Sequence, residues 1–160
     1  MAGTTKANPL PDLACACATI RRTARLVTQL YSHEMRPVEP GQFALLTAFA
    51  SHPGVSQATL GRALGIDKTT LSRNLRLLER NNWIIAGPTS DQRERGYRLT
   101  NAGKKTLAST EAGWLRAQRR LRSALKPGEW ETIMNVFGRV AGAALAAQKE
   151  APLKRKGRNT

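Results

Sequence analysis

The stretch Ser56–Asn82, SQATLGRALGIDKTTLSRNLRLLERNN, decides the fold of this chain. It holds two short helical segments separated by Gly65, which tolerates the left-handed backbone of a tight turn. Ser56 and Asp67 stand just before the two segments, where an N-cap side chain accepts hydrogen bonds from free backbone N–H groups. An apolar wedge is expected to fix the angle between the two helices, formed by Leu60, Leu64 and Ile66. The stretch therefore predicts a helix-turn-helix.

The second helix of this motif has two opposite faces at about 100° per residue. One face carries three leucines, Leu71, Leu75 and Leu78. The face almost opposite carries Thr69, Arg73, Arg76 and Arg80. Because the leucines must be buried, the arginines point outward, where a guanidinium can grip phosphate or contact guanine in the major groove. A merely solvated charged face is the plainer alternative, but the turn before the helix and the hairpin after it favour DNA.

The segment 83–100, WIIAGPTSDQRERGYRLT, predicts a wing after that helix. Residues 83–86 and 95–99 are expected to pair as antiparallel strands around a loop rich in turn residues. Arg93 or Arg95 at the tip would suit a narrow minor groove, which attracts an inserted arginine. Asp91 is expected to support a wing arginine by a charge-assisted hydrogen bond. An ordinary surface hairpin remains the alternative for this segment taken alone.

The expected DNA contacts come from both helices of the motif and from the wing. The N-terminal half of a recognition helix usually enters the groove, which favours base contacts from its first residues and phosphate contacts from Arg76 and Arg80. The complete expected set is Ser56, Gln57, Lys68, Thr69, Thr70, Ser72, Arg73, Arg76, Arg80, Arg93 and Arg95.

Composition supports a polyanionic partner. Lys and Arg number 26 against 11 acidic residues, a formal charge of +15 on 160 residues. Double-stranded DNA is the first candidate and an anionic membrane surface the second. No apolar run of about 18 residues and no secretory signal stand in the sequence, so we expect a cytoplasmic protein that does not enter membranes. No nucleophile–base pair, phosphate loop or metal-ligand cluster stands out, so we expect no enzyme, no cofactor and no metal site.

The chain is expected to be mainly α-helical with a small β-ribbon wing. We divide it into a flexible arm (1–11), a single protomer (12–148) and a basic, disordered tail (149–160). Within the protomer, a winged helix-turn-helix lobe (38–100) lies between terminal helices. The expected helices are 12–36, 42–51, 56–64, 67–81, 100–125 and 129–148.

The terminal helices, 12–36 and 101–148, carry apolar stripes at three- and four-residue spacing. The last one bears Trp130, Ile133, Phe137, either Val140 or Ala141, and Ala144. Such stripes are commonly part of a core, but a second copy of the chain would also cover them, and two-fold symmetry is the commonest arrangement. A homodimer would set two recognition helices about one DNA turn, roughly 34 Å, apart.

Two cysteines and two histidines carry weaker signals. Cys15 and Cys17 differ by about 200° around a helix, so they should not bridge each other. Small packing residues are the plainer interpretation, and a thiol sensor, which needs an accessible, acidified thiol, is the alternative. His33 and His52 lack neighbouring ligand residues and are expected to lie at the surface.

Residues 13–140 resemble the MarR family of transcriptional regulators. The resemblance rests on GQFALLTAF, on the helix-turn-helix, and on DQRERGYRLTNAGKK, where Asp91 and Arg93 precede Leu99, Thr100 and Gly103. It implies a homodimer that reads a near-palindromic operator, most often as a repressor. It also implies release by a small aromatic ligand or by an oxidant acting on a cysteine. For the ligand we expect a cleft lined by Tyr31, Arg22 and Arg25. The pair Asn81–Asn82 before Trp83 departs from the family pattern, and an architectural DNA-binding protein without an effector is the alternative function.

Overall fold

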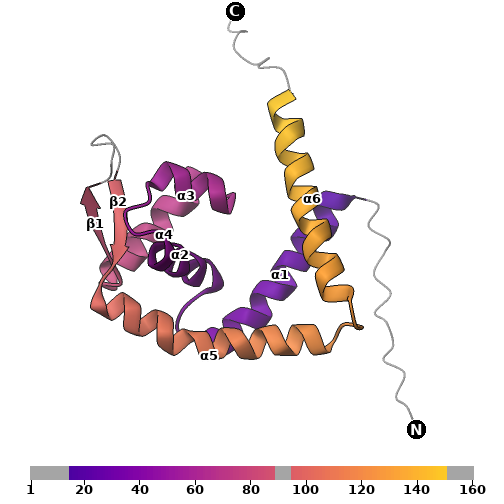
Figure 1. The fold of residues 1–160 in the computed structure, drawn as a ribbon, viewed down its shortest axis with the longest axis horizontal. Helices are drawn as coiled ribbons and strands as arrows, with labels where there is room; N and C mark the ends of the chain where they lie inside the picture. Colours follow the sequence, from indigo (N-terminus) through magenta and orange to yellow (C-terminus); the bar gives the residue numbers. More distant parts are fainter. Residues whose placement is uncertain (1–14, 89–94, 151–160) are drawn as a thin grey trace, which may run out of the picture. The chain divides into compact units, whose positions relative to one another are not determined.

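The structure, a computed structural model, describes residues 15–88 and 95–150 and contains six helices and one two-stranded sheet within those ranges (Figure 1). Their bounds are α1 Ala16–Met35, α2 Pro40–Ser51, α3 Gln57–Leu64, α4 Lys68–Arg80, β1 Ile84–Pro88, β2 Arg95–Leu99, α5 Asn101–Ser123 and α6 Glu129–Glu150. The mainly helical fold with a β-ribbon is the one that the sequence predicts. The chain divides into two compact units, residues 1–117 and 118–160, which are described separately.

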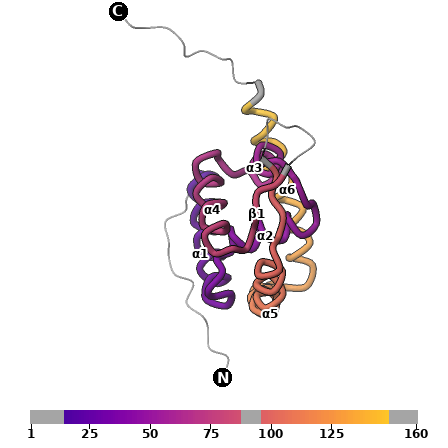
Figure 2. The backbone as a smooth tube through the Cα atoms, turned by 90° about the vertical axis from the view of Figure 1, so that its left-hand side faces the viewer, coloured from indigo at the N-terminus to yellow at the C-terminus, as the bar shows by residue number. Residues whose placement is uncertain are grey.

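The core of the first unit lies between α2, α3, α4 and the sheet, which lie together in Figure 1; Figure 2 shows α2, α3, α4 and β1 from the side. Its members are Val38, Leu45, Leu46, Phe49, Leu60, Leu71, Leu75, Leu78, Ile84 and Tyr97. The rings of Phe49 and Tyr97 meet at 5.7 Å between centroids, which joins α2 to β2. The three leucines of α4 are all buried, as the helical spacing predicts.

Helix α2 begins at Pro40, two residues earlier than the sequence analysis placed it. Pro40 lies between the expected helices 12–36 and 42–51, but proline is well suited to the first helical position because its missing N–H would be unpaired there. Glu39 caps the helix in a capping box: Gln42 Oε1 accepts from the Glu39 N–H at 3.0 Å, and the Glu39 side chain accepts from the Gln42 N–H. The link between α1 and α2 therefore comprises only residues 36–39.

The helix-turn-helix has the predicted caps and turn. Ser56 Oγ accepts from the Thr59 N–H at 3.2 Å, and Asp67 Oδ1 accepts from the N–H groups of Thr69 and Thr70 at 3.0 and 2.9 Å. Gly65 ends α3 in the left-handed region, with φ +63°. The predicted wedge is only partly right: Leu60 is buried and Ile66 half-buried, whereas Leu64 is 37% exposed.

The two strands of the wing pair antiparallel, with Ile84 opposite Leu99 and Ile85 opposite Arg98. Tyr97 lies opposite Ala86, so Trp83, which was expected to pair, stands outside the ladder. Its carbonyl oxygen instead accepts the Thr100 N–H at 3.1 Å. Thr100 Oγ1 donates to the Asn82 carbonyl at 2.6 Å and accepts from the Gly103 N–H at 3.0 Å. These bonds join the end of α4 to the start of α5.

Two glycines let α5 approach other backbone segments of the first unit. A Cβ on Gly103 would lie 1.9 Å from the Trp83 carbonyl oxygen, and one on Gly113 would lie 2.3 Å from that of Glu34. Arg116 strengthens the second contact, because its Nε donates to Glu34 Oε2 at 3.1 Å and its Nη2 to the Glu34 carbonyl at 3.2 Å. Helix α5 is therefore held at both the end of α4 and the end of α1.

The second unit contains the last residues of α5 and all of α6. Arg122 connects the two segments: its guanidinium lies 5.2 Å from the centre of the Trp130 ring, and its Nη2 pairs with Glu131 Oε1 at 3.3 Å. Helix α6 leaves several large apolar side chains exposed, namely Met134, Val136, Phe137, Val140 and Leu145.

Candidate nucleic-acid interface

Helix α4 presents the outward face that its sequence predicts. Thr69, Arg73, Arg76 and Arg80 are all exposed, opposite the three buried leucines. Within the residues that the structure describes, the guanidinium groups of Arg73, Arg76 and Arg80 form no ion pair. A cation whose charge is not neutralised by its own protein is available for phosphate or for the acceptors of a guanine edge.

The beginning of α4 adds further polar groups to this face. Lys68 and Thr70 are exposed, and Ser72 is half-buried. Asp67 does not compete with a bound anion for these groups, because its carboxylate is engaged as the N-cap of the same helix. Hydrogen bonds from the Thr70 hydroxyl, and then from the Thr70 and Thr69 N–H groups, hold the pKa of Asp67 below its usual range.

Helix α3 contributes less than the sequence suggests. Ser56 is half-buried, accepts from the Thr59 N–H and donates to Thr59 Oγ1 at 3.1 Å, so its hydroxyl serves the helix cap. Gln57, which follows it, is also half-buried. Ser56 additionally forms a backbone bridge with Gly96, and the Gly54 N–H donates to the Tyr97 carbonyl at 2.9 Å. The residues before α3 thus fix the wing against the helix-turn-helix.

The described part of the wing is a short ribbon that ends at Pro88 and Arg95, which face each other in the register. Arg95, a predicted contact, therefore stands at the end of β2 where the loop returns. Arg98 and Ile85 are exposed on one face of the ribbon, and Arg98 was not among the predicted contacts. Asp91 and Arg93 lie outside the described residues.

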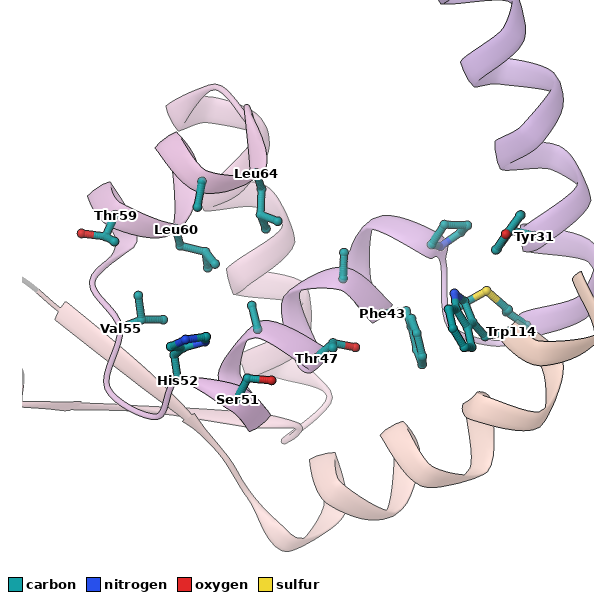
Figure 3. A pocket seen from close by; sticks show the side chains of 15 residues that line it. Tyr31, Phe43, Thr47, Ser51, His52, Val55, Thr59, Leu60, Leu64 and Trp114 are labelled. Carbon is teal, nitrogen blue, oxygen red and sulfur yellow. The ribbon is translucent and has the colours of Figure 1, made fainter. Parts of the chain in front are cut away.

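A cavity of about 680 Å³ opens in the first unit, among residues of α1, α2, α3 and α5 (Figure 3). Phe43 and Trp114 form one end of it, with ring centroids 6.0 Å apart and ring planes 24° from parallel. Val55, Leu60 and Leu64 stand at the other end. Six lining residues carry polar side-chain atoms, namely Tyr31, Thr47, Ser51, His52, Thr59 and Trp114. None of the described lining residues is Lys, Arg, Asp or Glu.

The expectation that Tyr31, Arg22 and Arg25 share one cleft is wrong for the arginines. Tyr31 lines the cavity, and burial raises its pKa. Arg22 and Arg25 line a separate hollow along α1 together with Cys15 and Cys17. The helical spacing explains the separation, because Arg22 and Arg25 lie about 180° and 120° around the helix from Tyr31.

Both cysteines are free thiols and exposed, so neither packs into a core within this chain, contrary to the plainer interpretation of the sequence. His33 and His52 are exposed, as expected. Among residues 15–88 and 95–150, no cluster of three His, Cys, Asp or Glu residues is placed to hold a metal ion. Over the same ranges, no helix is both long and apolar enough to cross a lipid bilayer.

Comparisons with known proteins agree with this geometry. Residues 37–94 match the model of the MarR family. A protein of Thauera aromatica, named for transcriptional regulation of the hcr operon, is 27% identical over 125 residues, which are 77% of this chain and 72% of that protein.

Two solved structures are similar over most of the chain. The M. tuberculosis transcriptional regulator MosR, in complex with DNA, is 27% identical with a TM-score of 0.75, over 83% of this chain and 98% of that one. The PcaV regulator of Streptomyces coelicolor, in complex with its natural ligand, is 22% identical with a TM-score of 0.76, over 86% and 99%. Both matches show that the chain shares the fold of these regulators.

Proposed function

Because the chain belongs to the MarR family of DNA-binding winged helix-turn-helix transcriptional regulators, which are not enzymes, we propose that it acts as a homodimeric repressor of a near-palindromic operator. Helix α4 enters the major groove and the wing lies along the minor groove. The observation that carries this proposal is the row of exposed guanidiniums on α4, Arg73, Arg76 and Arg80, opposite a fully buried leucine face.

The position of each residue along α4 decides whether we expect it to contact bases or phosphates. Lys68, Thr69, Thr70 and Arg73 lie in the N-terminal half, the part of a recognition helix that reaches base edges, and Ser72 lies beside them. Arg76 and Arg80 lie further along the helix and contact phosphates. On the wing, Arg95 and the neighbouring Arg93 are the candidates for the minor groove, with Asp91 supporting them. Ser56 and Gln57 contribute backbone or cap contacts beside the groove.

Dimerisation is supported by the apolar residues that a single chain leaves in water. Ile20 and Leu26 of α1 are 42% and 53% exposed, and Phe137 and Leu145 of α6 are 46% and 57% exposed. Exposed apolar side chains that form a contiguous patch mark an interaction site. A second copy would cover both helices and supply the second recognition helix that a two-fold symmetric operator requires.

The test is a selection of bound sequences from a random duplex pool with the full chain at physiological salt. A regulator enriches one two-fold symmetric motif and binds it at least about a thousandfold more tightly than bulk DNA. Equal binding to all duplexes would instead support an architectural protein without an operator. The formal charge of +15 makes this outcome a real competitor, because charge alone gives non-specific affinity.

Arg73→Ala tests where the reading helix lies. The variant should lose about 1–3 kcal/mol of binding to the selected site and should tolerate base changes at the position that Arg73 contacts. Arg119→Ala removes an exposed arginine of α5 and is the matched control, with binding close to that of the parent. Unchanged affinity and specificity in Arg73→Ala would place the recognition surface elsewhere.

We propose two routes by which the protein is released from its operator. PcaV, a fold relative, binds a natural ligand, and the cavity beside Phe43 and Trp114 offers this chain a place for one. Oxidation at Cys15 or Cys17 is the second route, supported by the exposure of both thiols. If a Cys15→Ser, Cys17→Ser double variant releases DNA on peroxide treatment as the parent does, the thiol route is excluded.

A further inference from the structure

Helix α1 meets the rest of the first unit through its last turns. Met35, its final residue, is buried with 2% of its surface exposed, whereas residues 19–26 are all exposed. Figure 1 shows α1 leading away from α2, α3, α4 and the sheet. Its 20 residues span about 30 Å at 1.5 Å per residue. The contacts that hold its last turn therefore set the direction of the whole helix.

One side of that last turn is held to α5. The two backbones touch at Gly113, where an added Cβ would lie 2.3 Å from the Glu34 carbonyl oxygen and 3.2 Å from the Cα of Met35. Beside this contact, Arg116 donates from Nε to Glu34 Oε2 at 3.1 Å and from Nη2 to the Glu34 carbonyl at 3.2 Å. Because one planar guanidinium holds a side-chain and a backbone acceptor, it fixes the orientation of the helix end as well as its distance.

The other side of the last turn is held to α2. Ser32 Oγ donates to Glu39 Oε2 at 2.6 Å, and Glu39 is the residue that caps α2 through its box with Gln42. Ser32 and Glu34 are two residues apart, which places them about 200° apart around the helix. Two tethers therefore hold opposite sides of α1, one to α5 and one to α2.

A small rotation at this joint produces a large displacement at the far end of α1. Ile20 and Leu26, exposed apolar residues of the proposed dimer interface, lie beyond the joint. A rotation of about 7° moves the end of a helix of about 30 Å by roughly 3.5 Å. That displacement is about the rise of one base pair, since 10–10.5 base pairs span about 34–36 Å of duplex. Because α5 is also held to the end of α4 at Gly103, the joint sets the position of the recognition helix relative to the dimer interface of α1.

We propose that Arg116 is a positioning residue for operator recognition and that, together with Ser32, it sets the separation of half-sites that the dimer accepts. Arg116 acts through Glu34 and the direction of α1, and its guanidinium is engaged there rather than on DNA. The inference rests on the proposed function, because it requires a dimer formed through α1 and a two-fold symmetric site. It gives the contact between Arg116 and Glu34 a role in specificity in addition to its contribution to stability.

Operators with altered half-site separation measure this role directly. Each base pair inserted or removed between the half-sites shifts one of them by roughly 3.4 Å and turns it by roughly 35°. The parent should bind its best separation at least about tenfold more tightly than separations one base pair away, and Arg116→Ala should reduce that preference to about threefold or less. Arg119→Ala removes an exposed arginine from the same helix and should keep the preference of the parent.

The pattern across separations distinguishes positioning from a merely structural role. A loss of stability alone leaves fewer chains folded and lowers binding to every separation by the same factor. Arg116→Lys retains a charge beside the Glu34 carboxylate but cannot also bond its carbonyl, so its preference should lie between those of the parent and Arg116→Ala. Ser32→Ala removes the tether to α2 and should also weaken the preference.

Spin labels on α4 measure the same effect without DNA. Glu79→Cys provides an exposed attachment point on α4, and Cys15→Ser with Cys17→Ser removes the two exposed native thiols. Electron–electron distance measurements on the full-length dimer then report the separation of the two recognition helices. With Arg116→Ala added, the distribution of distances should become wider by about 3 Å or more, the displacement expected from a few degrees of freedom at the joint.

Two results would overturn the inference: an equal loss of binding at every half-site separation in Arg116→Ala, or a distance distribution as narrow as that of the matched chain. The two readouts keep the proposals apart. A wider distribution in a chain that selects no symmetric operator would refute the repressor and leave Arg116 as the residue that positions the lobes. A symmetric operator whose spacing preference survives Arg116→Ala would refute only the role of Arg116.

Discussion

Gly103→Ala should destabilise the winged lobe although alanine is the better helix former. Gly103 lies in the first turn of α5, and a Cβ built on it falls 1.9 Å from the Trp83 carbonyl oxygen and 2.8 Å from the Trp83 carbonyl carbon. Since a carbon normally approaches a carbonyl oxygen no closer than about 3.3 Å, the two segments must separate by roughly 1.4 Å. The obstructing atoms are backbone, so no side-chain rotation can relieve the contact.

The cost follows from what the separation disrupts. The Trp83 carbonyl accepts the Thr100 N–H at 3.1 Å, and Thr100 Oγ1 donates to the Asn82 carbonyl at 2.6 Å. Losing a hydrogen bond at a partly buried carbonyl costs about 1–3 kcal/mol, and overpacking costs a similar amount. The gain in helix propensity returns at most about 1 kcal/mol. We expect a net loss of about 2–4 kcal/mol in the free energy of unfolding.

Urea unfolding at a fixed chain concentration measures this loss, because the stability of a dimer depends on concentration. Gly41→Ala is the matched control: Gly41 lies in α2 with nothing within 4 Å of the added Cβ, so alanine there should be neutral or stabilising by up to about 1 kcal/mol. A Gly103→Ala variant whose midpoint equals that of the parent would refute the argument that close backbone approach requires glycine at this position.

Three further predictions concern charge. The pKa of Asp67 is lowered by the Thr70 hydroxyl and by N–H groups of α4, so the cap stabilises the fold above the ordinary Asp pKa of about 3.9, and this contribution is lost as the pH falls through the lower folded value. Acid titration of stability should therefore fall more steeply below pH 4 in the parent than in Asp67→Asn, which caps without titrating. Arg116→Lys should lower the free energy of unfolding by about 0.5–1.5 kcal/mol, measured by thermal unfolding, since lysine cannot bond both the carboxylate and the carbonyl of Glu34. An unchanged free energy of unfolding would mean that these two hydrogen bonds do not stabilise the fold. Removing residues 151–160 takes away four basic residues, Lys154, Arg155, Lys156 and Arg158. If all four contact phosphates, the slope of log affinity against log salt concentration should become shallower by up to about 3.6. An unchanged slope would exclude the tail from DNA binding.

The helix-turn-helix could be predicted closely because its determinants are local. Ser56, Gly65 and Asp67 act on backbone groups within three residues, and the leucines of α4 are set by helical period alone. The prediction of helix bounds was wrong where a capping interaction was not recognised. Pro40 suggested a break but starts a helix, because the Glu39–Gln42 box was not recognised. A proline preceded by an acid and followed two residues later by Gln was the available signal.

The cavity could not be predicted, since its lining is contributed by four helices separated in the sequence. Tyr31 and Trp114 stand 83 positions apart in the chain, yet both border it. The cleft of Tyr31, Arg22 and Arg25 was expected from the resemblance alone. The helix turns the two arginines away from Tyr31, and they line a separate hollow. The role of Gly103 in joining α5 to Trp83 is likewise visible only in space.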